Sequence, residues 1–481
     1  MTALDQPARH ADGPERRPKR VPFPVVDEVA RHCLQEEEPE TVHIEVHLPG
    51  TPDPARLKAA FTEALRRHPR ILMREARGPW YRRRYEWELT AEPDVEVVTF
   101  PPPERDALKK ARIRSLSDSP PLSASPPIRM EVIASGEDGS IQPVRRLRTN
   151  SAEPVTDGHL DAGTPDGSGR PARASVLFLT INHTALDGPA CLRVLATAAE
   201  LYGGQDNSPA APPPLRTAPS PAPEAERAPV DAPSGWAPPA RVSKGTPEPS
   251  PGNGMLVAEL PVPHRPKGAP FTVNDQLMVA TALMIAHWNR EHGSRPRPFR
   301  ITMPVDDRPR DMEMPIGNGT RLVEVPFSAG ELTGKEWGPE EIGALLRRTS
   351  ERTRALKALT RPQLGHGAAL LTSPVLPVTV RAALTRGLRR AAGPWTSTTL
   401  LSNIGRVPYP LDFGDAGRAY AVWFSAPARL PRGLTVTTAS TAGRLHLALR
   451  WSKTLLSHGD GAHLRDLFEH YLHATEEGTS S

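Results

Sequence analysis

The stretch Val176-Leu-Phe-Leu-Thr-Ile-Asn-His183-Thr-Ala-Leu-Asp187-Gly-Pro189 decides how the chain is organised. Its first six residues form a nearly continuous apolar run, which is typical of a strand buried on both faces. Proline directly after the glycine suits the first turn of a helix, which we expect over about 189–202. His183 therefore lies where a buried strand ends and a helix begins, a position at which α/β proteins collect functional residues.

This His-x-x-x-Asp-Gly spacing has two interpretations. Imidazole titrates near neutral pH, so His183 suits a general base, with Asp187 and Gly188 fixing the turn. The alternative is a hydrogen-bonded core histidine, with Asp187 as an ordinary cap of the following helix. Cys191, one turn into that helix, is expected to be a buried core residue. Both interpretations of His183 stay open on the spacing alone.

Elements of both kinds recur on either side of this stretch. In the first half, the apolar pattern predicts strands over 41–48 and 128–133 and a helix that contains Leu57 to Leu65. In the second half, it predicts a helix that starts with a capping box at Thr272 and Asp275. Further expected elements there are strands over 300–305 and 320–327, a hairpin of 434–440 with 445–451, and a last helix over about 462–474. We therefore predict an α/β protein with two α+β two-layer lobes.

Proline marks the boundaries between these lobes. The chain has 57 prolines in 481 residues, and fourteen of them fall between positions 209 and 251. Such a segment cannot bury a core, so we expect a linker over 204–252. Residues 1–20 are expected to form a disordered basic tail, and 135–174 a low-complexity insertion. These boundaries leave an N-terminal lobe over 21–203 and a C-terminal lobe over 253–475.

Composition argues against several classes of protein. The longest apolar runs are far shorter than a membrane span, and the first twenty residues lack the apolar core of a signal peptide, so we expect a cytoplasmic protein. Two cysteines cannot form a disulfide framework or a zinc cluster, and no metal-ligand spacing is evident. A net charge of +5 is small for 481 residues and disfavours a nucleic-acid binder.

The segment around His183 resembles the active-site motif of the chloramphenicol acetyltransferase-like superfamily, which includes peptide-synthetase condensation domains, wax ester synthases and plant acyltransferases. The family signature is His-His-x-x-x-Asp-Gly, and Asn182 stands here in place of the first histidine. Other segments that resemble the family are, in chain order, 53–69, 126–129, 272–275, 303–309 with 316–318, and 401–405. The resemblance covers about 21–475.

The resemblance implies a fold and a site. The expected fold has two lobes like chloramphenicol acetyltransferase, arranged as a V-shaped pseudo-dimer with a central tunnel. The implied general base is His183. The family aspartate, here Asp187, faces away from the substrate and pairs with an arginine of the second lobe, for which Arg308 is the candidate. Gly188 and Asn182 complete the structural residues that the resemblance assigns to the active site.

The resemblance also implies a reaction. We expect a stand-alone condensation-type acyltransferase, acting in specialised metabolism, that moves an acyl group to a small amine or hydroxyl acceptor. Its donor would be an acyl-CoA or a phosphopantetheinyl carrier-protein thioester, with no tightly bound cofactor. The chain is expected to be a monomer without a membrane span and without a nucleic-acid partner.

Two other functions remain open at this point. One is a lipid-type O-acyltransferase similar to wax ester synthases, and the other is a catalytically silent scaffold that binds a carrier protein. Arginine clusters at 66–84 and at 381–390 would suit CoA phosphates or an acidic carrier protein. The alternative for both clusters is an ordinary solvated surface.

Overall fold

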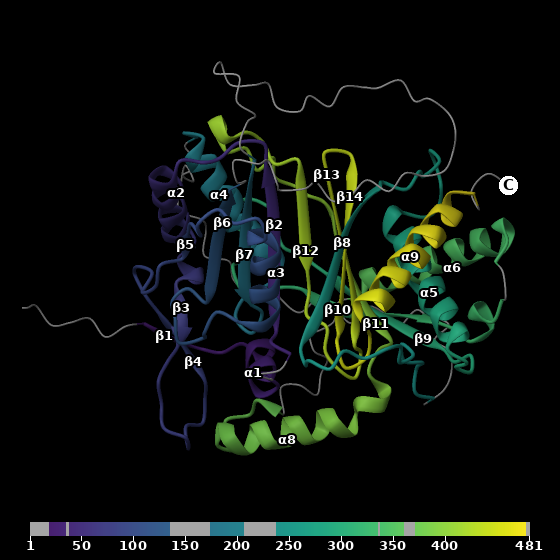
Figure 1. Cartoon of the computed structure of the whole chain (residues 1–481). Coiled ribbons are helices and arrows are strands. Elements are labelled where there is room, and N and C mark those ends of the chain that lie inside the picture. The colour runs from purple at the N-terminus through teal and green to yellow at the C-terminus, as the bar shows by residue number, and fades with distance from the viewer. Residues whose placement is uncertain are drawn as a thin grey trace, which may run out of the picture.

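A computed structural model of the chain describes residues 19–34, 38–134, 174–205, 237–334, 337–359 and 371–477. The molecule has two lobes that lie side by side, each with one large sheet covered by helices (Figure 1). The predicted architecture of two α+β lobes is therefore confirmed. The predicted tail and insertion, except for their last residues 19–20 and 174, and residues 206–236 of the predicted linker lie outside the described residues.

The sheet of the first lobe has five strands in the order β12-β2-β7-β6-β5. These strands are β2 (Thr41–Leu48), β5 (Val98–Thr99), β6 (Ile128–Ala134), β7 (Ser175–Asn182) and β12 (Ala421–Ser425). The apolar run of residues 176–181 lies in β7, at the centre of this sheet, and all eight residues of the strand are buried. A small sheet in the order β1-β4-β3 lies beside it, formed by β1 (Arg20–Pro22), β3 (Met73–Glu75) and β4 (Glu86–Leu89).

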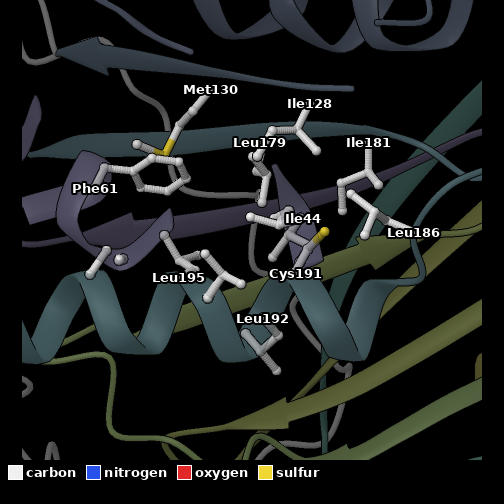
Figure 2. Packing of buried hydrophobic residues seen from close by; sticks show 14 of the residues in the cluster. Ile44, Phe61, Ile128, Met130, Leu179, Ile181, Leu186, Cys191, Leu192 and Leu195 are labelled. Carbon is white, nitrogen blue, oxygen red and sulfur yellow. The ribbon is translucent and has the colours of Figure 1, made fainter. Parts of the chain in front are cut away.

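Helices cover both faces of the first sheet. They are α2 (Pro54–Arg67), α3 (Ala107–Ser117) and α4 (Gly188–Tyr202), and a further helix of this lobe is α1 (Val25–His32). Phe61 of α2 and Cys191 of α4 pack with Ile44 and Leu179 of the sheet in one apolar core (Figure 2). Cys191 is buried in this core, as predicted, and burial raises the pKa of its thiol well above the usual range.

The second lobe has a six-stranded sheet in the order β10-β9-β11-β13-β14-β8. Its strands are β8 (Asn253–Pro261), β9 (Phe299–Val305), β10 (Arg321–Phe327), β11 (Thr399–Arg406), β13 (Leu434–Thr441) and β14 (Arg444–Ser452). Helices α5 (Val273–Glu291), α6 (Pro339–Ala358) and α9 (His458–Glu477) pack on this sheet. The predicted capping box is present at the start of α5, where Thr272 and Asp275 bond each other's backbone.

The second half of the chain contributes a strand to the sheet of the first lobe. This strand is β12, which pairs antiparallel with β2. Arg450 of β14 adds to this junction by donating to the carbonyl oxygen of Thr41 at 2.6 Å. Helix α8 (Val378–Ala391) likewise comes from the second half but packs against α1 of the first lobe (Figure 1). The lobes are therefore interlocked rather than joined by one linker.

Part of the predicted linker packs against the second lobe. In residues 237–252, the buried side chains of Ala240 and Val242 join the apolar core of this lobe. The backbone of Ser243 is held by Asn289 and Trp288 of α5, with N–H to Oδ1 at 2.7 Å and carbonyl to Nε1 at 2.9 Å. In this part of the predicted linker, apolar residues between the prolines provide enough buried contact to fix the chain.

Candidate active site

His183 lies in the turn between β7 and α4, and its ring orientation is set by the turn. The ring Nδ1 is 3.0 Å from the backbone carbonyl oxygen of Leu186. A carbonyl oxygen can only accept, so in the neutral form of the ring Nδ1 carries the proton and Nε2 has the lone pair. The backbone N–H of His183 donates to the carbonyl oxygen of Glu40 at 2.8 Å, which ties the turn to the segment before β2.

Asp187 is the N-cap of α4 and the centre of an ion-pair network. Its Oδ1 accepts from the backbone N–H of Ala190 at 3.0 Å. Its Oδ2 accepts from Nη2 of Arg308 at 2.7 Å and from the backbone N–H of Gly319 at 2.8 Å. Arg308 also bonds Asp306, with Nε to Oδ1 at 2.8 Å. The carboxylate of Asp187 is thus fully engaged in holding the turn against the second lobe.

Gly319 is required by the close approach of Arg308. A Cβ added at position 319 would lie 2.4 Å from the guanidinium carbon of Arg308, which is far inside van der Waals contact. Glycine at this position therefore lets the guanidinium reach Asp187 while the Gly319 N–H bonds the same carboxylate.

Asn318 connects the turn to a buried acid on α1. Its Nδ2 donates to the carbonyl oxygens of His183 and Thr184, at 3.2 and 3.0 Å, and to Oδ1 of Asp27 at 2.9 Å. Asp27 also accepts from Nε1 of Trp87 at 2.9 Å. Burial raises the pKa of Asp27 to about 7, although the hydrogen bonds from Asn318 and Trp87 oppose the rise.

This raised pKa predicts a pH-dependent effect of Asp27→Asn on stability. The folded protein keeps a proton on Asp27 up to about pH 7, whereas the unfolded chain loses it near pH 4. The stability that Asp27 contributes is therefore complete below pH 4 and lost as the pH rises to about 7, by at most about 1.4 kcal/mol per unit. Asparagine cannot titrate. The unfolding free energy of Asp27→Asn, relative to wild type, should rise from pH 4 to 7 and then stay constant in urea melts. A difference that is independent of pH would contradict the raised pKa.

The other two residues assigned to the turn have structural surroundings. Asn182 is buried, and its Nδ2 donates to the carbonyl oxygen of Pro120 at 2.9 Å while its Oδ1 accepts from the N–H of Thr184 at 3.0 Å. Asn182 thus braces the turn from the side of the first lobe. Gly188 begins α4 and lines the cavity, and a Cβ there would make only ordinary contacts, at 3.5 Å, with Phe424 and Val42.

A cavity of about 540 Å³ lies between the lobes, with His183 in its wall. Both halves of the chain contribute to it. Its apolar lining includes Val29, Val42, Leu192, Leu322, Leu400 and Phe424, and its polar lining includes Glu40, Ser402, Asn403 and Tyr409. A cavity of this size and mixed lining suits a small or medium-sized organic ligand.

Arginines add positive charge to the same cavity. Arg389, Arg429 and Arg432 line it, and Arg429 pairs with the carboxylate of Glu40. Burial raises the pKa of Glu40, although the charges of His183 and the arginines oppose the rise. Burial lowers the pKa of Arg432 to about 10, still well above neutral pH. Sequence reasoning did not identify Glu40, Arg429 or Arg432, because the segments that carry them are far apart along the chain.

Several arginines of the first predicted cluster, residues 66–84, form ion pairs with carboxylates. Arg66 bonds Glu92, Arg74 bonds Glu88 and Asp94, and Arg82 pairs with Glu75. These guanidinium groups are therefore balanced within the first lobe. In the described part of the chain, no group of three His, Cys, Asp or Glu side chains is arranged to hold a metal ion.

Among the comparisons with known proteins, those with solved structures bear on the fold. No protein-family model matches the chain. Two uncharacterized proteins of Mycobacterium tuberculosis, from different strains, are each 26% identical over 422 residues, or 81% of this chain and 84% of theirs. Trichothecene 15-O-acetyltransferase from Fusarium sporotrichioides superposes with a TM-score of 0.59, at 11% identity, over 95% of this chain and 96% of that chain.

Condensation domains superpose similarly. The first condensation domain of the CDA synthetase has a TM-score of 0.57 at 13% identity, over 97% of this chain and 98% of that one. A variant of the starter condensation domain of rhizomide synthetase, in complex with C8-CoA, has the same score and identity over 95% and 94%. The chain therefore has the two-lobe, chloramphenicol acetyltransferase-like fold. The predicted resemblance to this superfamily is confirmed at the level of the fold.

Proposed function

We propose that this protein is a stand-alone condensation-type acyltransferase that uses His183 as general base. The observation that carries the proposal is the hydrogen bond from Nδ1 of His183 to the Leu186 carbonyl, in the wall of the cavity between the lobes. This bond assigns the lone pair to Nε2, the ring nitrogen that can then take a proton. The network around Asp187 would hold the turn in the productive geometry.

In the proposed reaction, an amine or hydroxyl of the acceptor attacks the thioester carbonyl of the donor. The acceptor proton passes to Nε2 of His183 while the new carbon–nitrogen or carbon–oxygen bond forms. The tetrahedral intermediate then expels the thiolate as the carbon–sulfur bond breaks, and His183 returns the proton to sulfur. No acyl-enzyme is required, and the cavity would supply the proximity of the two substrates.

An acyl-CoA or a carrier-protein thioester is the proposed donor. The complex of a related fold with C8-CoA supports a thioester of this kind. The arginines of the cavity would favour a donor or acceptor that carries negative charge. We further propose a small amine or alcohol as acceptor, in specialised metabolism.

The proposal can be tested with octanoyl-CoA and a panel of primary amines and alcohols. We expect acceptor-dependent release of CoA thiol, with an amide or ester of matching mass formed in equal amount. The nature of the product then distinguishes an N- from an O-acyltransferase. His183→Ala serves as the control, because it keeps the cavity and removes the base.

Two results would contradict the proposal. Product formation that is unchanged in His183→Ala would exclude the histidine as base. Binding of a carrier protein or of octanoyl-CoA, with no turnover for any acceptor or for the carrier-bound donor, would instead support the catalytically silent scaffold.

A further inference from the structure

Helix α8 presents an apolar stripe to solvent. Val380, Leu384 and Leu388 follow one another at four-residue spacing and therefore share one helix face. All three are exposed, Leu384 by 50% and Leu388 by 53%. The buried residues of the helix are Val378, Arg381, Ala382 and Thr385, and the helix packs against α1.

A second exposed group lies next to this helix, in the loop between β3 and β4. Trp80 and Tyr81 are 76% and 60% exposed and contact each other edge to face. The loop is joined to α8 by the backbone N–H of Val378, which donates to the carbonyl oxygen of Arg82 at 2.9 Å. Arg381 strengthens the junction by donating to the carbonyl oxygen of Arg83 at 2.6 Å. The loop and α8 lie along the same lower edge of the molecule in Figure 1.

We call this combined surface, residues 76–85 and 371–396, the α8 face. Its charge is one-sided, because these 36 residues contain eight arginines and no aspartate or glutamate. Arg82 and Arg381 are paired with Glu75 and Glu28, and Arg389 lines the catalytic cavity. The other five are exposed to solvent, namely Arg77, Arg83, Arg84, Arg386 and Arg390.

We propose that the α8 face docks on the surface of an anionic lipid bilayer. An amphipathic helix with an aliphatic stripe and flanking arginines is the type of element that lies in the membrane interface. Tryptophan and tyrosine are the side chains most enriched at that depth, and Trp80 and Tyr81 flank the helix. The five exposed arginines of the α8 face complement the negative potential of anionic lipid headgroups.

An acidic protein partner is the other class that could match this charge. The lipid surface is favoured because the exposed apolar side chains of α8 and of the loop line neither the cavity that contains His183 nor the cavity beside α8, so they offer no pocket for an anchoring side chain. Binding at a bilayer requires no such shape complementarity. In the described chain, no helix is long and apolar enough to cross a membrane, so the contact would be peripheral.

The α8 face also lies close to the proposed reaction site. A second cavity, of about 640 Å³, lies beside α8 and is lined by Arg386, Gly387 and Arg390. It shares Cys33, Arg389 and Pro431 with the cavity that contains His183. Docking through α8 would therefore place the bilayer beside a route by which a lipophilic substrate could reach the site.

Flotation of the full-length protein with vesicles tests the proposal. We expect binding to vesicles of about three parts phosphatidylcholine to one part phosphatidylglycerol, and at least about tenfold weaker binding to phosphatidylcholine alone. The double variant Leu384→Glu/Leu388→Glu should bind the anionic vesicles at least about tenfold more weakly than wild type. Raising the salt from about 0.05 to 0.5 M should weaken binding of wild type, because it screens the arginines.

Ile113→Glu is the matched control, since Ile113 is an exposed apolar residue on α3, outside the α8 face. It should bind anionic vesicles as wild type does. His183→Ala should also bind normally, so that loss of docking and loss of catalysis are separable. Failure of wild type to float with anionic vesicles at low salt would overturn the proposal. Equal binding by Leu384→Glu/Leu388→Glu and wild type would overturn the assignment of α8.

Discussion

His183→Ala is expected to lower turnover of the acyl thioester by about 10²–10⁴-fold without changing the fold. The loss is large because no other group in the turn can replace Nε2 as proton acceptor. Asp187 is fully engaged by Arg308, Ala190 and Gly319, and its carboxylate cannot leave that network without breaking the turn. The rate of thiol release from the acyl thioester measures the loss of turnover. Thermal melting of the same preparations checks that the fold is unchanged.

His183→Asn is the sharper companion variant. The asparagine Nδ2 occupies the place of Nδ1 and can donate to the Leu186 carbonyl, so the turn keeps its hydrogen bond, but an amide is not a base at neutral pH. It should melt like wild type and be as slow as His183→Ala. Turnover near the wild-type rate in either variant would exclude His183 as the general base.

Arg308→Ala should be the most destabilising single change in the network, by about 3–5 kcal/mol. It removes the cation from two carboxylates at once, those of Asp187 and Asp306, in a site where the side chain of Asp187 is only 3% exposed. Asp187→Ala should cost less, because Arg308 keeps Asp306, although the N-cap bond to Ala190 is also lost. Both variants should lose activity with stability, since both release the turn that carries His183.

The double variant Asp187→Ala/Arg308→Ala tests whether the two side chains stabilise each other or only lie close together. If Asp187 and Arg308 act on each other, the combined loss of unfolding free energy is smaller than the sum of the single losses. Arg310→Ala is the control, because Arg310 is exposed two residues away. Denaturant melts of the four proteins give the coupling energy, and strict additivity would exclude an energetic role for the pair.

Local signals were sufficient for much of this molecule. The apolar run of β7 predicts a strand buried on both faces, and the structure places it at the centre of its sheet. The Thr272 and Asp275 spacing predicts the capping box that starts α5. These features depend on neighbours within a few residues, which is the range over which propensity and periodicity act.

Long-range features could not be predicted in this way. Nothing in Ala421–Ser425 indicates that the strand pairs with β2 rather than with its neighbours in the second lobe. Glu40 and Arg429 meet across 389 positions, and each looks like an ordinary charge in its own segment. The sequence likewise does not indicate that Arg66 pairs with Glu92 and Arg74 with Glu88, because these partners meet only in the folded lobe.

The pairing of β12 with β2 has a consequence for the order of events during synthesis. The ribosome synthesises β2, β6 and β7 more than two hundred residues before β12. The β2 edge of the first sheet therefore stays uncovered until β12 has been made. That edge includes His43, Glu45 and His47, which are buried in the finished protein. An uncovered strand edge can pair with other chains, so the β2 edge is a site of aggregation in the nascent first half until β12 has been synthesised.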